Sequence, residues 1–382
     1  MSVILDEHRE YLGDPQRLSS FRRAITEVVR PGDIVVDLGA GTGVLGLFAC
    51  QAGAAKVFSI EQGPIVSLAQ EICRANGFAD RVSFIKSASL RAKVPEKADV
   101  VVADQIGFFG FEAGLLEYFL DARQRFLVSE GKMIPSRIEL WATPVNIPER
   151  YVNVEFWSNR PADLDFSPAC SVATNTLDSA SFEPKHLLSE PQRLASLDLL
   201  TWADRSLSYT GEYAIERTGK MHGIGGWFSA KLSPGVTMTN SPLATTRMGR
   251  SNAFLPLEHP IEVEAGDRAL LNIHIVPSEG LVSWNVGISR NENSTWVSKT
   301  GSRQSTFKGI LLREGDLRQT QPNFVPRRTP WGDARLSVLN LCDGQRPLKE
   351  IEAEVYHRHP NLFRSPAEVA GFVARVVARY SQ

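Results

Sequence analysis

The 382-residue chain is predicted to be an α/β protein, in which a parallel sheet covered by helices precedes a β-rich domain and a small helical domain. Two changes of pattern predict this order. Apolar runs of strand length alternate with helical spacing up to about residue 142, and alternating apolar and polar segments joined by Gly, Pro and Ser then follow. Helical spacing returns after a segment rich in proline and polar residues, 316–332.

In the first region, strands and helices alternate as expected for a parallel sheet with helices on both faces. We expect helices over residues 15–29, 64–76 and 115–127, and strands over residues 33–38, 57–61, 82–85 and 98–103. Ligands of such sheets bind beyond the carboxyl ends of the strands, which is where Gly39, Glu61 and Asp104 fall.

The second region is expected to form a β-barrel or sandwich, and the third a helical module. Strands are expected over 139–143, 222–231, 261–263, 269–276 and 282–289, and helices over 334–341, 348–357 and 367–380. The predicted division is a helical segment (1–29), a parallel α/β domain (30–142), a β-barrel domain (143–315), a linker (316–332) and a helical module (333–382).

Composition and charge exclude several classes of partner. Lys and Arg number 42 against 43 Asp and Glu, so no global charge attracts the chain to nucleic acid. No run reaches the roughly 18 apolar residues that cross a bilayer, and the N-terminus carries acids where a signal peptide carries lysines. We therefore expect a cytoplasmic protein with neither membrane nor nucleic-acid partners. The four cysteines are widely spaced, which predicts neither a metal site nor a disulfide framework.

Residues 35–45 (VVDLGAGTGVL) indicate a nucleoside cofactor. They read as a buried strand, a glycine-rich turn and a helix start, and the next strand ends in Glu61, which can accept both hydroxyls of a ribose. The spacing is D-x-G-x-G-x-G, whereas a dinucleotide fingerprint is G-x-G-x-x-G. Asp37 would repel a diphosphate and suits an ammonium, so S-adenosylmethionine fits better than NAD. The alternative is a tight turn without a ligand.

These segments resemble the protein arginine methyltransferase family. The resemblance covers VVDLGAGTG at 35–43, AGA at 52–54, GKMIP at 131–135, EPKHLL at 183–188 and the strand at 222–232. It implies a Rossmann-like class I methyltransferase domain, a β-barrel, and conversion of S-adenosylmethionine to S-adenosylhomocysteine. It also implies a homodimer built through an arm within residues 151–180, and a lid over the cofactor formed by residues 1–29.

The resemblance also implies cofactor-binding residues. In the family, the helix matched by HREYLGDPQR carries a histidine and an arginine near the methionine carboxylate, here His8 and Arg17. Arg17 could instead be a solvated arginine on a helix face. Asp37, Gly39 and Gly41 would line the methionine portion, and Glu61 the ribose. The remaining candidates are Ala40, Val44, Leu45, Gln62, Ser89 and Asp104.

The acceptor side departs from the family pattern. Family members that methylate arginine carry two glutamates in a hairpin after the fourth strand; here Asp104 takes the first position and Ala113 the second, with Glu112 adjacent. Asp104 and Glu112 are therefore the candidate catalytic residues. The family's Thr-His-Trp loop is replaced by Thr246-Arg247-Met248.

The loss of these family residues affects which methyl acceptor the chain can bind. A guanidinium needs carboxylates that localise its charge and accept a proton, and one acid orients it poorly. Arg247 and Arg250 would favour an anionic substrate, or they are ordinary surface charges of the barrel. We expect N-methylation of a peptide or a natural-product intermediate. The alternatives are a divergent arginine N-methyltransferase acting on protein or free arginine, and a non-catalytic scaffold that binds the cofactor and a peptide.

The helical module contains a second resemblance. The stretch LCDGQRPLKEI at 341–351 is similar to the PqqD-like peptide-recognition module, a small winged-helix fold that presents precursor peptides to modifying enzymes. In those modules an exposed strand edge captures an extended leader peptide. The other reading is that the module only caps the barrel.

Overall fold

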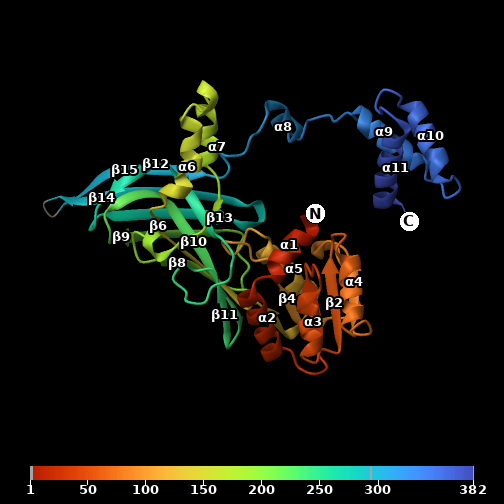
Figure 1. Cartoon of the computed structure of the whole chain (residues 1–382), viewed down its shortest axis with the longest axis horizontal. Helices are drawn as coiled ribbons and strands as arrows, with labels where there is room; N and C mark the ends of the chain where they lie inside the picture. Colours follow the sequence, from red (N-terminus) through yellow and green to blue (C-terminus); the bar gives the residue numbers. More distant parts are fainter. Residues whose placement is uncertain (1–2, 293–294, 382) are drawn as a thin grey trace. The chain divides into compact units, whose positions relative to one another are not determined.

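The computed structural model describes residues 3–292 and 295–381, which form two compact units (Figure 1). The first unit ends at Ile310 and the second begins at Leu311, a few residues before the predicted linker. Each unit has its own hydrophobic core, since the buried cluster of the second contains no residue before Ala334. Among the described helices, none is long and apolar enough to span a bilayer.

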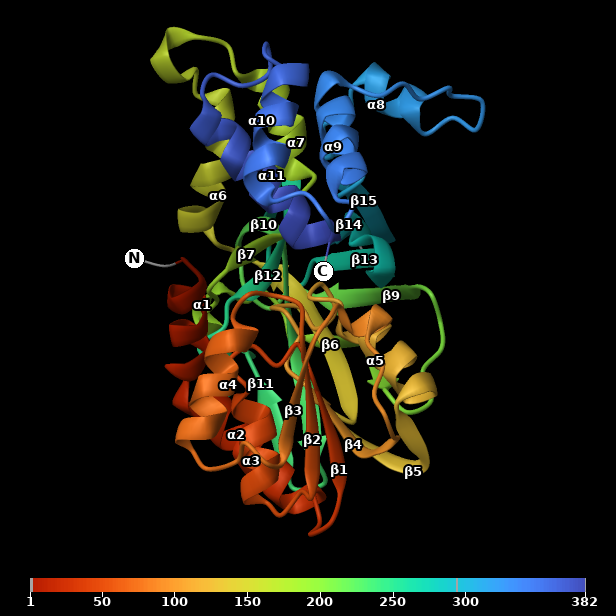
Figure 2. The same cartoon turned by 90° about the vertical axis from the view of Figure 1, so that its right-hand side faces the viewer.

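A five-stranded parallel sheet opens the first unit, in the order β3-β2-β1-β4-β5. Its strands are β1 (Ile34–Leu38), β2 (Lys56–Glu61), β3 (Val82–Lys86), β4 (Ala98–Ala103) and β5 (Leu127–Ile134). Figure 2 shows α2 (Pro15–Val28), α3 (Val44–Gln51) and α4 (Val66–Ala75) on one side of the sheet, and α5 (Leu115–Arg125) on the other. Coverage on both faces explains why β1 and β4 are nearly all apolar. The predicted strands are confirmed to within about two residues.

The β-rich part contains a six-stranded and a four-stranded sheet. The first is ordered β7-β12-β10-β6-β8, with β11 also on β10, and the second β15-β14-β13-β9. The strands are β6 (Arg137–Val145), β7 (Asp178–Ala180), β8 (Gln192–Asp198), β9 (Leu207–Ala214), β10 (Gly219–Ser233), β11 (Val236–Thr239), β12 (Asn252–Val263), β13 (Arg268–Val276), β14 (Leu281–Glu292) and β15 (Thr295–Ser305). β10 and β6 pair over nine residues. Residues 247–251, in the connection between β10 and β12, lie at the ligand-binding edge of the parallel sheet.

The first unit has helices in two further segments, one at its N-terminus and one after β6. α1 (Val3–Leu12) precedes α2, and the Asp14 side chain caps α2 by accepting from the Arg17 N–H at 3.0 Å. α6 (Pro148–Glu155) and α7 (Cys170–Thr174) project from the β-rich part in the segment expected to form the arm (Figure 1). Phe156 and Leu164 on this segment are exposed.

The second unit is helical, as predicted. It contains α8 (Glu314–Gln319), α9 (Pro330–Leu341), α10 (Leu348–Arg358) and α11 (Pro366–Tyr380). Thr329 and Ser365 cap α9 and α11, each followed by proline at the first helical position. No strand occurs in the described residues 311–381, so the strand edge implied by the PqqD-like resemblance is not present there. α8 also lies across the start of the segment expected to be a linker.

Candidate cofactor and acceptor site

A cavity of about 1360 Å³ lies at the carboxyl ends of β1, β2 and β4. Four parts of the first unit line it: α1 with the start of α2, the two turns that follow β1 and β2, the segment after β4, and the β-rich loop 247–251. The candidate residues on its surface are His8, Arg17, Gly39, Ala40, Gly41, Val44, Leu45, Glu61, Gln62 and Asp104. The predicted ligand-binding edge of the sheet is therefore where the cavity occurs.

In the turn after β1, the positions of Gly39 and Gly41 leave no space for a side chain. Gly39 and Gly41 have φ of +62° and +53°, a region that L residues with side chains rarely adopt. A Cβ on Gly39 would lie 2.3 Å from Gln105 Nε2, and one on Gly41 would lie 2.8 Å from His8 Cε1. The exposed backbone of this turn thus faces the cavity between His8 and Gln105.

Glu61 connects the two turns that border the cavity. Its carboxylate accepts hydrogen bonds from the Gly41 N–H at 3.0 Å and the Gly63 N–H at 2.6 Å. Each carboxylate oxygen has further acceptor capacity. Glu61 is therefore held at the mouth of the glycine turn with acceptors available for a bound diol.

Asp37 does not line the cavity, in contrast to the expectation that it contacts the methionine portion. Its side chain is fully buried, and Oδ2 accepts from the Gly46 N–H at 3.0 Å. Burial raises the pKa of Asp37 to about 7. The physical reason for the difference is side-chain direction, because Asp37 points from β1 toward the first turn of α3 rather than beyond the strand end.

Ser89 also lies outside the cavity lining. It is buried in the short helix η1 (Ser89–Arg91), where its carbonyl accepts from Arg125 Nη2 at 2.7 Å. Leu90 beside it is exposed. The expectation that Ser89 binds the cofactor therefore has no geometric support in this arrangement.

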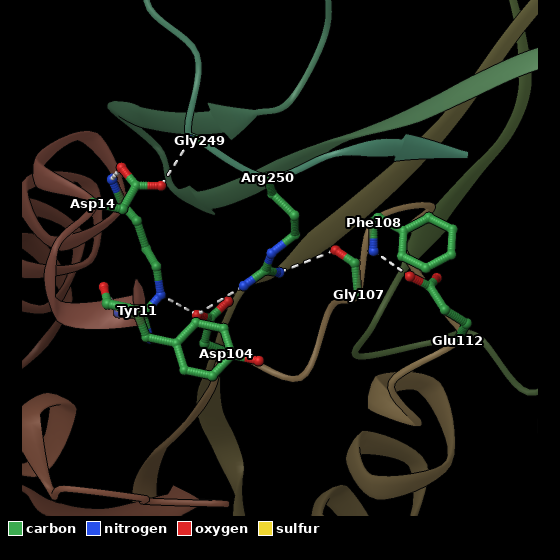
Figure 3. A network of polar contacts seen from close by, with 9 residues as sticks. Tyr11, Asp14, Asp104, Gly107, Phe108, Glu112, Gly249 and Arg250 are labelled. Atoms are coloured by element: carbon green, nitrogen blue, oxygen red, sulfur yellow. Dashed lines mark hydrogen bonds and ion pairs between the residues drawn. The ribbon is translucent and has the colours of Figure 1, made fainter. Parts of the chain in front are cut away.

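Asp104 lies on the cavity surface between two arginines from different parts of the chain (Figure 3). Arg17 of α2 donates to Asp104 Oδ2 and also donates to the Tyr11 carbonyl at 3.0 Å. Arg250 of the 247–251 loop lies 3.5 Å from the same oxygen and donates to the Gly107 carbonyl at 3.0 Å. The other oxygen, Oδ1, is buried and has no partner among the described residues.

Two polar residues without an expected role hold this arrangement together. Asp14 Oδ2 accepts from the Gly249 N–H at 2.8 Å, so the residue that caps α2 also fixes the barrel loop. Asn240 donates to the carbonyls of Phe108 and Ser251, at 2.8 and 2.6 Å. The Asp14-Pro15 pair is a recognisable helix start, whereas the Asn240 contacts span distances in sequence that no local pattern reveals.

Glu112 is turned into its own loop and is absent from the cavity lining. Its carboxylate accepts from the backbone N–H group of Phe108 (Figure 3). It also accepts from the N–H groups of Phe109 at 3.1 Å and Phe111 at 3.3 Å. Burial raises the pKa of Glu112 above its ordinary value. Asp104 and Glu112 therefore do not face one pocket, and Glu112 organises the loop after β4.

Comparisons with known proteins match both parts of the first unit. A family model described as "Ribosomal protein L11 methyltransferase (PrmA)" matches residues 22–140, and one described as "Arginine methyltransferase oligomerization subdomain" matches residues 136–284. Protein arginine N-methyltransferase 6 of Xenopus laevis is 27% identical over 287 residues, which cover 71% of this chain and 84% of that relative. Probable protein arginine N-methyltransferase 6 of Arabidopsis thaliana is 29% identical over 261 residues, covering 65% of this chain but only 60% of that relative.

Solved structures show the same fold. A Trypanosoma brucei PRMT1 enzyme-prozyme heterotetrameric complex with AdoHcy has a TM-score of 0.68 and 21% identity, covering 78% of this chain and 97% of that one. Arabidopsis thaliana protein arginine methyltransferase 10 has a TM-score of 0.69 and 20% identity, covering 79% and 98%. The chain is a methyltransferase that uses S-adenosylmethionine, and its sequence is similar to those of protein arginine methyltransferases.

The glycine end of the cavity has groups that fit this cofactor. The Arg17 guanidinium suits a carboxylate, and the Glu61 carboxylate suits ribose hydroxyls. Gln105 Oε1 is buried without a partner among the described residues, so it can accept from an ammonium. These groups thus match the carboxylate, the ammonium and the ribose hydroxyls of S-adenosylmethionine.

Substitution of Glu112 by glutamine is expected to lower stability. A neutral amide accepts backbone hydrogen bonds more weakly than a carboxylate and places an N–H₂ group beside N–H donors, so the free energy of unfolding should fall by about 1–3 kcal/mol. Urea denaturation measures this change, with Glu117→Gln on the exposed face of α5 as the control. Unchanged stability with abolished methyl transfer would instead give Glu112 a direct role in the reaction.

Asp37 is expected to make stability depend on pH. Its folded pKa of about 7 exceeds that of an unfolded aspartate, about 3.9, so its favourable contribution is complete below pH ~4 and is lost as pH rises through about 7. Relative to Asp37→Asn, the wild-type free energy of unfolding should fall by up to about 4 kcal/mol from pH 4 to pH 8. Denaturation series at several pH values test this, with Asp80→Asn, an exposed site, as control. Parallel profiles for wild type and Asp37→Asn would contradict the assignment.

Proposed function

We propose that this methyltransferase is a divergent arginine N-methyltransferase, which methylates a guanidinium nitrogen of protein or free arginine. The observation that carries the proposal is the position of Asp104, an acid on the same cavity as the glycine turn, with one buried oxygen that has no partner among the described residues. The names of the similar proteins support the same acceptor. These names favour arginine over the peptide or natural-product acceptor expected from the sequence.

In this proposal the glycine end holds the cofactor. Arg17 pairs with the methionine carboxylate, the backbone at Gly39 and Gly41 allows close approach, and Glu61 accepts the ribose hydroxyls. His8 and Gln105 border the turn on either side. Arg17 uses Nε for Asp104 and Nη1 for the Tyr11 carbonyl, so its Nη2 donors remain for the cofactor carboxylate.

Asp104 then binds and orients the acceptor. S-adenosylmethionine supplies a methyl group on a sulfonium, which a nitrogen lone pair can attack. A guanidinium has such a lone pair only when its charge is localised on the other nitrogens, and a carboxylate hydrogen bond favours that distribution. The N–C bond forms as the C–S bond breaks, and the proton lost from nitrogen passes to Asp104 Oδ1 or to solvent.

A second acceptor class is favoured by a specific observation. Asp104 is paired with two arginines of the chain and Glu112 is turned into its loop, so the site offers fewer free acids than a guanidinium requires. A peptide amine or a natural-product nitrogen that is neutral at pH 7 needs less negative charge. The acceptor screen below separates the two classes.

Two further features are part of the proposal. We propose that the arm around α6 and α7, which carries exposed Phe156 and Leu164, mediates a homodimer. We also propose that the second unit binds peptide, through its helices rather than through the strand edge that a PqqD-like module uses. Light scattering at the monomer mass would contradict the dimer.

Methyl transfer is expected from labelled S-adenosylmethionine to arginine-containing acceptors, and Asp104→Asn should reduce kcat/KM at least about a hundredfold because it removes the proton-accepting charge. Mass spectrometry of the products identifies the methylated atom, and the acceptor set includes peptides without arginine. Exclusive methylation of other nitrogens would favour the second class.

A fragment ending at Ile310 tests the role of the second unit. Loss of this unit should raise KM for peptide acceptors and leave KM for small acceptors unchanged.

A further inference from the structure

The loop between β11 and β12 places two arginines on the cavity surface, and their surroundings differ. Arg250 is largely buried and is used internally, because it contacts Asp104 and donates to the Gly107 carbonyl. Arg247 is exposed, and its one hydrogen bond is to the neutral Phe182 carbonyl, at 2.9 Å. Within the described part of the chain, Arg247 takes part in no ion pair.

Glu183 does not pair with Arg247. Glu183 lies close enough to feel its charge, but the Glu183 carboxylate pairs with Lys185 at 3.0 Å. The hydrogen bond to Phe182 uses one of the five N–H donors of the guanidinium. Arg247, which lines the cavity, therefore keeps free donors and its full charge.

The charged side chains that line the cavity are of both signs. After β4, Arg17 and Arg250 offset the single carboxylate of Asp104, and Arg247 adds to this positive charge. Glu7 and Glu10 on α1 also line the cavity, and both are exposed. An acceptor that carries both charges can pair with Arg247 and with an acid of the lining.

We propose that the methyl acceptor carries an anionic group, a carboxylate, that pairs with Arg247. The inference rests on the proposed function, because it concerns the arginine that this enzyme methylates. Two sources supply that carboxylate: the acceptor is free arginine with its own α-carboxylate, or a peptide arginine flanked by an acidic residue. A guanidinium–carboxylate pair can be bidentate, so it also fixes the orientation of the acceptor.

Binding and turnover of matched acceptors test this inference. Arginine is compared with agmatine, which lacks the carboxylate, and an acetylated Asp-Arg-Asp amide with the Gly-Arg-Gly amide. Calorimetry in saturating S-adenosylhomocysteine gives Kd, and steady-state assays give KM and kcat separately. The variants are Arg247→Met, which removes the charge, Arg247→Lys, which keeps it, and Arg205→Met, an exposed arginine outside the cavity lining, as control.

We expect the carboxylate-bearing acceptor of at least one pair to bind about tenfold or more tightly than its partner, with the difference in KM rather than kcat. The pair that shows this difference in affinity identifies the source of the carboxylate. Arg247→Met should abolish the difference, Arg247→Lys should restore part of it, and Arg205→Met should leave it unchanged. Equal binding within both pairs by an active enzyme overturns this inference alone. Failure of every arginine compound to bind or react overturns the proposed function and this inference with it.

Discussion

The ion pairs of Asp104 are the interaction on which the rest of the site depends. One carboxylate at the end of β4 contacts Arg17 of α2 and Arg250 of the barrel loop, and so joins the parallel sheet, the N-terminal helices and the β-rich part at a single point. The Asp104 side chain is only 6% exposed and the two arginines 8% and 14%. Charges removed from water to this extent must be paired, since leaving one unpaired costs several kcal/mol.

The cavity takes its shape from this contact and from its neutral supports. Asp14 holds the barrel loop at Gly249, and Asn240 holds the same loop at Ser251 while also contacting Phe108 after β4. Cofactor and acceptor sites therefore share a wall. Because Arg17 is proposed to bind the cofactor carboxylate and also contacts Asp104, occupancy at one end should change the charge presented at the other.

The sequence predicted the sheet and the cavity edge well, because both depend on local patterns. β1 and β4 are short apolar runs, and the glycine turn follows directly from its spacing. Strands such as β9, whose side chains are mostly polar, and the three-residue β7 were not predicted, because periodicity carries little signal over such segments.

At the site, side-chain direction accounts for the differences between the expected and the observed placement of residues. Asp37 has the right residue type beside the glycine turn but bonds to Gly46, and Glu112 has the right charge but bonds to its own loop. The contacts of Asn240 with Phe108 and of Arg250 with Asp104 cross more than a hundred residues of sequence. The family resemblance indicated Arg17 and Asp104 as two separate candidates. Only the fold shows that they pair with each other.

A double-mutant cycle between Asp104 and Arg250 tests the central role of this contact most directly. Free energies of unfolding are measured for wild type, Asp104→Asn, Arg250→Met and the double variant. If the pair joins the loop to the sheet, the two changes should be non-additive, with a coupling of about 1 kcal/mol or more. Additivity to within about 0.5 kcal/mol would show that the barrel loop is held independently of Asp104 and would contradict the account.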